Sequence, residues 1–149
     1  MSLNPSVLLA CDTDETANAL QPSLHRLQCF LPKTDIALML PGFNQSELLP
    51  DSGVQIRWIS SWLDVSTLQR LSQATFKLAI LFTAPGRSPY TMAYICYLAG
   101  IPIRLGQSVE FGGGVLTSCV HPIQDYVSVE NYHLHLSHSI DSFLDLTKD

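Results

Sequence analysis

Three carboxylates near the start of the chain are its strongest candidates for acid–base chemistry. The apolar run Val7–Ala10 predicts a buried strand, and Asp12, Asp14 and Glu15 follow it closely. Ligands of open parallel sheets bind beyond the carboxyl ends of the strands, so this position favours a functional site. We predict that one of these three carboxylates removes a proton from a substrate hydroxyl. Asp12 and Thr16 are predicted to contact the substrate. The structural alternative is that these carboxylates stabilise the positive end of a helix dipole, by about 0.3–1 kcal/mol each.

A second candidate site is the loop Thr83–Ser88, which follows the apolar run Phe76–Phe82. Apart from Lys77 the run is apolar throughout, as expected of a central parallel strand that is buried on both faces. The loop offers the hydroxyls of Thr83 and Ser88 and the guanidinium of Arg87, and it leads into a helix start without acidic residues. Helix N-termini and arginine side chains bind anions, so we predict that these residues bind the substrate, through an anionic group or as an acceptor site. The alternative is a solvated turn in which Arg87 pairs with a nearby carboxylate.

No cofactor and no metal are predicted from the sequence. The acidic residues after the first apolar run would repel the phosphates of a nucleotide cofactor, and no glycine-rich dinucleotide motif follows that run. Placed on a helix, the three histidines near the C-terminus lie at about 0°, 200° and 140° around its axis, so at most two share a face. We therefore predict that they are surface residues and not zinc ligands: His133, His135 and His138.

Composition and charge indicate one folded, cytoplasmic domain. The chain has 149 residues, 46% of them hydrophobic and 14% charged, which argues against disorder and fits a single core. Its net charge of −5 lacks the basic character of a nucleic-acid binder. No signal peptide is recognisable, and no apolar run approaches the roughly 20 residues of a membrane span. The cysteines are scattered singly and predicted to be reduced, with Cys29 and Cys96 packed as small apolar side chains.

Short apolar runs alternate with helical patterns along the chain, which predicts parallel strands joined by crossover helices. The strands are expected over 7–10, 36–40, 54–59, 76–82, 101–103 and 115–120. The helices are expected over 14–30, 64–74 and 89–98, and for roughly 16 residues around 129–143. Pro22 either kinks the first helix or lets its regular part begin near Gln21. Ser88 is expected to cap the third helix, with Pro89 at its first position. With at most a short helix over 43–49 and a loop over 106–114, the prediction is one Rossmann-like α/β domain over 1–149. Its mostly parallel sheet is covered by helices on both faces.

Several stretches of the sequence resemble the N-terminal half of glycosyltransferase family 9, the lipopolysaccharide heptosyltransferases and their relatives. The resemblance is carried by Tyr94–Gly106 and Glu110–Leu116, and it is strongest to cyanobacterial members. Pro22–Leu24 with Phe30–Pro32, followed by Asp35–Phe43, are similar to the first helix, the second strand and the turn after it in that family. The resemblance covers nearly the whole chain. It implies the N-terminal half of a GT-B-like architecture, in which two Rossmann-like domains enclose the active site. This chain would then be the acceptor-side half, and the nucleotide-sugar donor would be held by a C-terminal domain or a partner protein.

The resemblance also implies a general base for an inverting sugar transfer. In the family a Gly-Asp pair stands six residues before the proline of the first helix, and its Asp is that base. Counting back from Pro22 places Glu15 and Thr16 at those positions, and Asp14 and Glu15 are the nearest carboxylates. A shift of one residue along a helix means about 1.5 Å of rise and 100° of rotation. A displacement near 1 Å can cost about a hundredfold in rate, so this departure from the pattern argues against efficient catalysis.

Two functional hypotheses follow from the sequence. The first is a glycosyltransferase acceptor domain of lipopolysaccharide biosynthesis that is active only beside a donor-binding half. The second is a non-catalytic relic or protein-interaction module with the same fold, which is also favoured by Val127 standing where the family often has a histidine. A stand-alone nucleotide-binding domain is a weaker third, because of the acidic first loop. In each case an exposed apolar patch is expected, and with it a homodimer or a partner protein.

Overall fold

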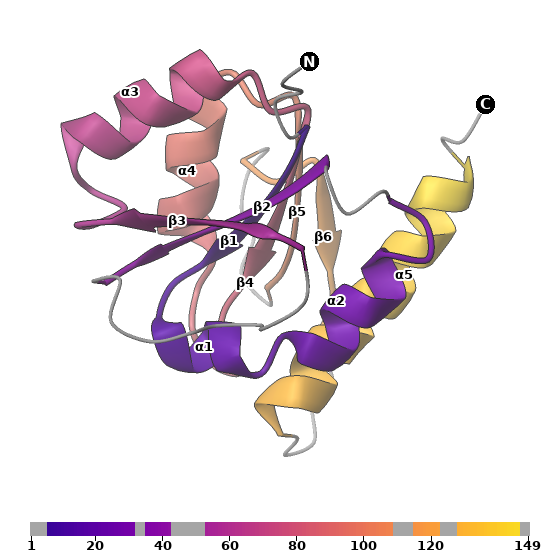
Figure 1. Ribbon diagram of the computed structural model, residues 1–149. Helices are drawn as coiled ribbons and strands as arrows, with labels where there is room; N and C mark the ends of the chain where they lie inside the picture. Colours follow the sequence, from indigo (N-terminus) through magenta and orange to yellow (C-terminus); the bar gives the residue numbers. More distant parts are fainter. Residues whose placement is uncertain (1–5, 32–34, 43–52, 109–114, 123–127, 147–149) are drawn as a thin grey trace.

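A six-stranded sheet forms the centre of the molecule (Figure 1). The computed structural model describes residues 6–31, 35–42, 53–108, 115–122 and 128–146, with the backbone alone for 141–146. Within these residues every strand pairing is parallel, and the strand order is β3-β2-β1-β4-β5-β6. The strands are β1 (Val7–Cys11), β2 (Ile36–Pro41), β3 (Gln55–Ile59), β4 (Leu78–Phe82), β5 (Ile103–Gln107) and β6 (Ser118–Val120). The predicted Rossmann-like α/β fold with a parallel sheet is thereby confirmed.

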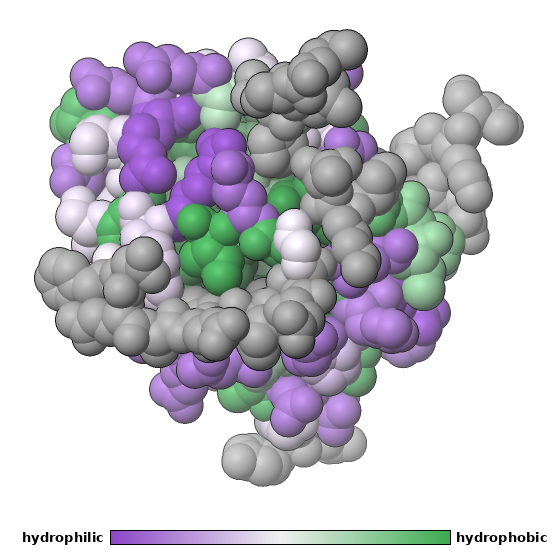
Figure 2. Space-filling model, viewed as in Figure 1, coloured by the Kyte–Doolittle hydropathy of each residue, from purple (hydrophilic) through white to green (hydrophobic). Residues whose placement is uncertain are grey.

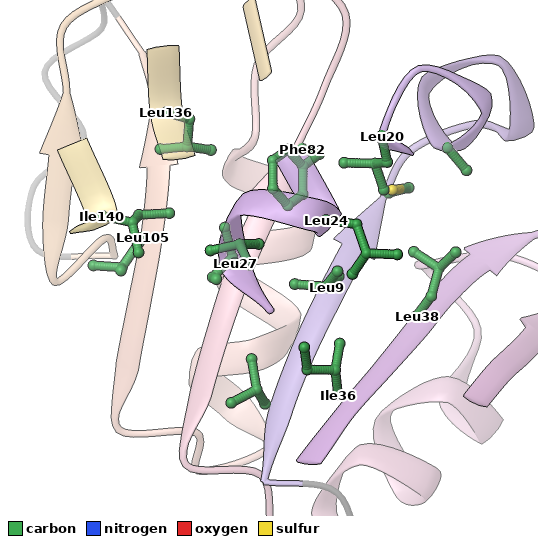
Figure 3. Packing of buried hydrophobic residues seen from close by; sticks show 14 of the residues in the cluster. Leu9, Leu20, Leu24, Leu27, Ile36, Leu38, Phe82, Leu105, Leu136 and Ile140 are labelled. Carbon is green, nitrogen blue, oxygen red and sulfur yellow. The ribbon is translucent and has the colours of Figure 1, made fainter. Parts of the chain in front are cut away.

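Helices cover both faces of this sheet, as predicted. The helices are α1 (Asp14–Asn18), α2 (Gln21–Leu27), α3 (Val65–Ala74), α4 (Tyr90–Leu98) and α5 (Val129–Leu146). α3 and α4 lie on one face and α2 and α5 on the other, while the short α1 lies at one end of the sheet (Figure 1). Because successive strand residues point to opposite faces, Leu9 belongs to the apolar cluster on the α2–α5 side, where it lies near Leu24 of α2, and Leu136 of α5 belongs to the same cluster further along the sheet (Figure 3). Its neighbour Leu8 packs with Met92 on the other side. Burial on both faces explains the continuous apolar runs of the central strands.

The predicted helix over 14–30 is two short helices. α1 ends at Asn18, and α2 begins at Gln21, which confirms the alternative in which the regular part starts there. Pro22 lacks the amide hydrogen that would bond the Asn18 carbonyl in one continuous helix, so the break falls just before it. α2 ends at Leu27, and Cys29 beyond it is exposed, so its predicted apolar surroundings are wrong.

Two boundaries near the second candidate site differ from the prediction. β5 continues to Gln107, so Gly106 is a buried strand residue and not the start of a loop. A Cβ at Gly106 would lie 3.4 Å from a methyl carbon of Leu116 and 3.5 Å from Leu81, ordinary van der Waals distances, so the strand is closely packed at this residue. α4 begins at Tyr90, one residue later than predicted, and the Ser88 hydroxyl accepts a hydrogen bond from the Tyr90 amide at 3.2 Å. The predictions for 43–49 and 109–114 lie outside the described residues.

Candidate functional site

The two predicted sites meet at one edge of the sheet. β1 pairs with β4, and the strand order reverses between them, since β2 and β3 continue on one side and β5 and β6 on the other. Ligands of such sheets bind at this reversal, beyond the carboxyl ends of the two strands. The loops after β1 and β4 therefore lie side by side, and they bring Arg87 Nε to 3.3 Å from Asp12 Oδ2. The Asp12 side chain is 19% exposed and that of Arg87 is 54% exposed, so the pair lies at the molecular surface.

Asp12 is held by the hydroxyls at the start of α1. The Thr16 hydroxyl donates a hydrogen bond to Asp12 Oδ1 at 2.7 Å. Thr13 is the N-cap of α1: its hydroxyl accepts from the Thr16 amide at 3.2 Å and donates to the Thr16 hydroxyl at 3.1 Å. One carboxylate oxygen therefore faces Thr16 and the other faces Arg87, which fixes the orientation of the carboxylate. Thr13 was not among the predicted site residues, although threonine before acidic residues is a common helix start.

Asp14 and Glu15, the predicted bases, lie in the first turn of α1 and are exposed. Neither makes a hydrogen bond or an ion pair within the described part of the chain. Their position agrees with the dipole-stabilising alternative, and their exposure leaves both carboxylates accessible from solvent.

The loop after β4 is a closed turn. The Arg87 amide donates to the Ala84 carbonyl at 3.1 Å, and the Thr83 hydroxyl donates to the Arg87 carbonyl at 3.2 Å. Gly86 has a φ of +85°, a conformation that glycine adopts without strain. The N-cap of α4 is Pro89 and not Ser88 as predicted, although the Ser88 hydroxyl accepts a hydrogen bond from the Tyr90 amide; Arg87 pairs with Asp12. The structure therefore has the alternative arrangement of this loop, in which Arg87 pairs with a nearby carboxylate. An anion at Arg87 would compete with Asp12.

His133 was predicted to be a surface residue, and the structure shows that this is wrong. The side chain has no solvent exposure, and its ring contacts that of Phe82 edge-on with centroids 5.1 Å apart. His133 Nε2 lies 3.1 Å from the Thr16 carbonyl oxygen. Helical spacing shows which residues share a face but not which face points inward. The signal was present, because His133 precedes Leu136 and Ile140 of the core by three and seven residues.

The His133 ring is neutral near pH 7. Burial lowers its pKa to about 4, and the hydrogen bond to the Thr16 carbonyl and the nearby Asp12 charge offset only part of this effect. A carbonyl oxygen only accepts, so Nε2 carries the ring hydrogen and Nδ1 is an acceptor. Nδ1 is buried and has no hydrogen-bond partner among the described residues. The other two histidines differ: His135 Nε2 lies 2.8 Å from the His121 carbonyl oxygen, and His138 is exposed.

The first turns of α5 also tie the ends of β4 and β5 together. Gln107, the last residue of β5, donates through Nε2 to the Tyr132 carbonyl at 2.7 Å. Burial raises the pKa of Tyr132, and a hydrogen bond with the Thr83 side chain opposes that rise. No local pattern places Gln107 or Tyr132 near the site, because both contacts depend on how α5 packs across the sheet.

The arrangement can orient a polar, hydroxyl-bearing ligand and accept a proton from it. Three carboxylates and one guanidinium lie at the β1–β4 edge, so the local charge is negative. Within the described residues no three His, Cys, Asp or Glu side chains form a group that could hold a metal ion. In the same residues no helix combines the length and apolar character needed to cross a membrane.

No protein-family model and no curated protein matches the sequence. The fold, however, is similar to part of a glycosyltransferase. The E. coli ADP-heptose lipopolysaccharide heptosyltransferase II superposes with a TM-score of 0.58 at 19% identity, over 88% of this chain and 40% of that one. A glycosyl transferase family 9 structure from Veillonella parvula gives a TM-score of 0.55 at 10% identity, over 94% of this chain and 42% of that one. At these identities the likeness shows the fold, and the chain spans about two fifths of the length of both proteins.

Proposed function

We propose that this chain is the acceptor-side half of a heptosyltransferase-like glycosyltransferase. On this proposal it works in the cytoplasm in lipopolysaccharide biosynthesis, beside a domain or protein that holds the nucleotide-sugar donor. The observation that carries the proposal is the acidic cluster with Arg87 at the strand-order reversal of a sheet that resembles heptosyltransferase II. The partial coverage of both solved glycosyltransferases supports a chain that needs a second half.

The proposed roles follow from how each side chain is held. Asp12 is bound by Thr16 and Arg87, so its carboxylate is suited to orienting an acceptor hydroxyl. Asp14 or Glu15, exposed on the first turn of α1, takes the proton from that hydroxyl. The acceptor oxygen then bonds to the anomeric carbon of the donor, and the nucleotide leaves with the electron pair of the broken bond.

The predicted residues of the second loop complete the acceptor site. Thr83, Arg87 and Ser88 lie beside the first loop because β4 is the neighbour of β1. Arg87 is the cation of this edge nearest to Asp12, and its half-exposed guanidinium can bind an acceptor group in exchange for that carboxylate. Thr83 closes the turn that presents Arg87.

The second candidate function is a non-catalytic relic or interaction module with the same fold. Two observations favour it. Asp12 and Arg87 already form an ion pair with each other, and Asp14 and Glu15 lie in the first turn of α1, where carboxylates commonly stabilise the helix dipole. Such an arrangement is stable without any substrate.

One experiment separates the two functions. The chain is mixed with a separately produced donor-binding half of a family 9 glycosyltransferase, and transfer from ADP- or GDP-sugars is measured. The acceptor-domain proposal expects turnover that Asp14→Asn or Glu15→Gln abolishes, whereas Asn18→Asp, an exposed change at the end of the same helix, leaves it unaffected. Turnover that survives both carboxylate substitutions would contradict the proposed base. A folded mixture without turnover would favour the relic.

A further inference from the structure

A second surface, on the helical layer formed by α3 and α4, gathers most of the exposed apolar side chains. Among the described residues, six large hydrophobic side chains are exposed, and five of them lie in α3, in α4 or directly before α3. We call this surface the α3–α4 face; its exposed members are Leu63, Val65, Tyr94, Tyr97 and Leu98. The sixth, Phe30, follows α2 on the opposite side of the sheet (Figure 1). The clustering on one helical layer is what an interaction surface requires.

Helix α4 presents a continuous stripe to solvent. Tyr94, Tyr97 and Leu98 are three and four residues apart, so they share one face, and each is half exposed. The opposite face, which includes Met92 and Cys96, is buried against the sheet. Three large exposed side chains of this kind are unexpected on a helix of nine residues, because the solvent face of a helix is normally polar.

The aromatic part of this stripe is already ordered. The Tyr94 and Tyr97 rings lie with their centroids 6.3 Å apart. The Arg104 guanidinium lies 5.2 Å from the centroid of the Tyr97 ring, and Arg104 is itself buried and bonded to the carbonyls of Ile101 and Val115. Ordered side chains lose less conformational freedom when they enter an interface. Tyrosine is also among the residues enriched at interfaces.

The charge of the face indicates which partner it suits. The chain has a net charge of −5, but α4 contains no charged residue, and the charges of Asp64, between Leu63 and Val65, and of Arg70 in α3 cancel, so the face carries no net charge. Two copies of a negatively charged chain repel each other unless they meet through an uncharged surface. A partner of opposite charge would instead be expected at a charged surface. We propose that the α3–α4 face is the self-association surface of this chain, where two copies pack face to face about a two-fold axis.

The size of the face sets the strength of the dimer. The five side chains are 50–76% exposed, the two tyrosines being larger and the aliphatic side chains more exposed on average, so each offers about 100 Å². Two copies would then bury about 1,000 Å² of these side chains together, the lower end of specific interfaces. Interfaces of this size are typical of weak, transient complexes, so we expect a reversible dimer that dissociates on dilution.

The test is sedimentation equilibrium of the full chain across a range of concentrations, with matched variants. The wild-type chain should form dimers, and Leu98→Glu should raise the Kd at least tenfold. Tyr94→Asp, as a second variant, should act in the same direction. Phe30→Glu places the same charge at an exposed apolar residue on the other side of the sheet and should leave the Kd unchanged. Circular dichroism confirms that each variant is folded.

Salt gives an independent check on the same samples. Because two chains of like charge meet through an uncharged face, raising NaCl from about 20 mM to about 500 mM should lower the Kd. A chain that stays monomeric at millimolar concentration would overturn the proposal and leave the face to a different protein. A dimer that Leu98→Glu and Phe30→Glu weaken equally, or that salt dissociates, would also overturn it.

Discussion

His133 makes the stability of the fold depend on pH in a range that can be calculated from the structure. Its pKa is lowered by burial to about 4, against an ordinary value of 6.5 in the unfolded chain. Between these values the unfolded state binds a proton that the folded state excludes, so stability rises with pH. The stability that the fold gains from keeping the His133 ring neutral is fully present above pH 6.5. It is lost progressively as the pH falls and is absent below pH 4. At 1.36 kcal/mol per pKa unit, the full loss is about 3 kcal/mol, and about 2 kcal/mol is lost by pH 5.

The assay is urea unfolding of the wild-type chain and of His133→Gln at several values between pH 7.5 and 4. A glutamine amide can still donate to the Thr16 carbonyl but does not titrate, so the variant should lose about 2 kcal/mol less than the wild type between pH 7.5 and 5. His138→Gln, an exposed change on the same helix, is the control and should keep the wild-type pH dependence. Equal slopes for the wild type and His133→Gln, or a His133 ring that titrates near pH 6.5 in nuclear magnetic resonance spectra, would refute the reasoning.

Three further predictions concern the framework around the site. Gly42→Ala should destabilise the fold by about 2–3 kcal/mol, because φ is +141° and the new Cβ would lie 2.8 Å from the Trp58 ring. Gly86→Ala, with φ of +85° and open space around it, should cost only about 1 kcal/mol; equal losses in thermal unfolding would contradict this comparison. Trp62→Phe should cost about 1–3 kcal/mol in urea unfolding, since the indole donates at 2.8 Å to the buried Cys11 carbonyl, and an unchanged midpoint would count against that bond. A thiol reagent should label the exposed Cys29 and Cys119 rapidly in the folded chain and should not label the buried Cys11 and Cys96. Burial raises the pKa of Cys96 to about 12 and that of Cys11 well above its ordinary value, so neither forms a reactive thiolate. Rapid labelling of all four cysteines would disprove this.

Much of the fold follows from local pattern. The run Leu78–Phe82 is apolar without interruption because β4 is buried on both faces, and that alone identifies a central strand. The break before α2 was one of two outcomes that Pro22 allows. The boundary at β5 was missed because Gly106 looks like a loop residue, whereas its close neighbours Leu116 and Leu81 come from other parts of the chain.

The candidate site could be predicted only in part. Asp12 and Arg87 were each identified from the strand that precedes them, but their pairing depends on β1 and β4 being neighbours, which the order of elements along the chain does not specify. His133 was missed for a related reason. Its burial depends on how α5 lies across the sheet, and its contact with the Thr16 carbonyl joins residues 117 positions apart. Local patterns therefore find candidate side chains, and tertiary contacts decide which of them act together.

The proposed function requires that this chain is the half of a sugar-transferring enzyme that does not hold the donor. Isothermal titration calorimetry of the 149-residue chain with ADP- and GDP-sugars tests this most directly. If the chain is the acceptor-side half, it should give no measurable heat of binding at millimolar nucleotide-sugar. Saturable binding at tens of micromolar would contradict it, because a donor site would then be present in this chain alone.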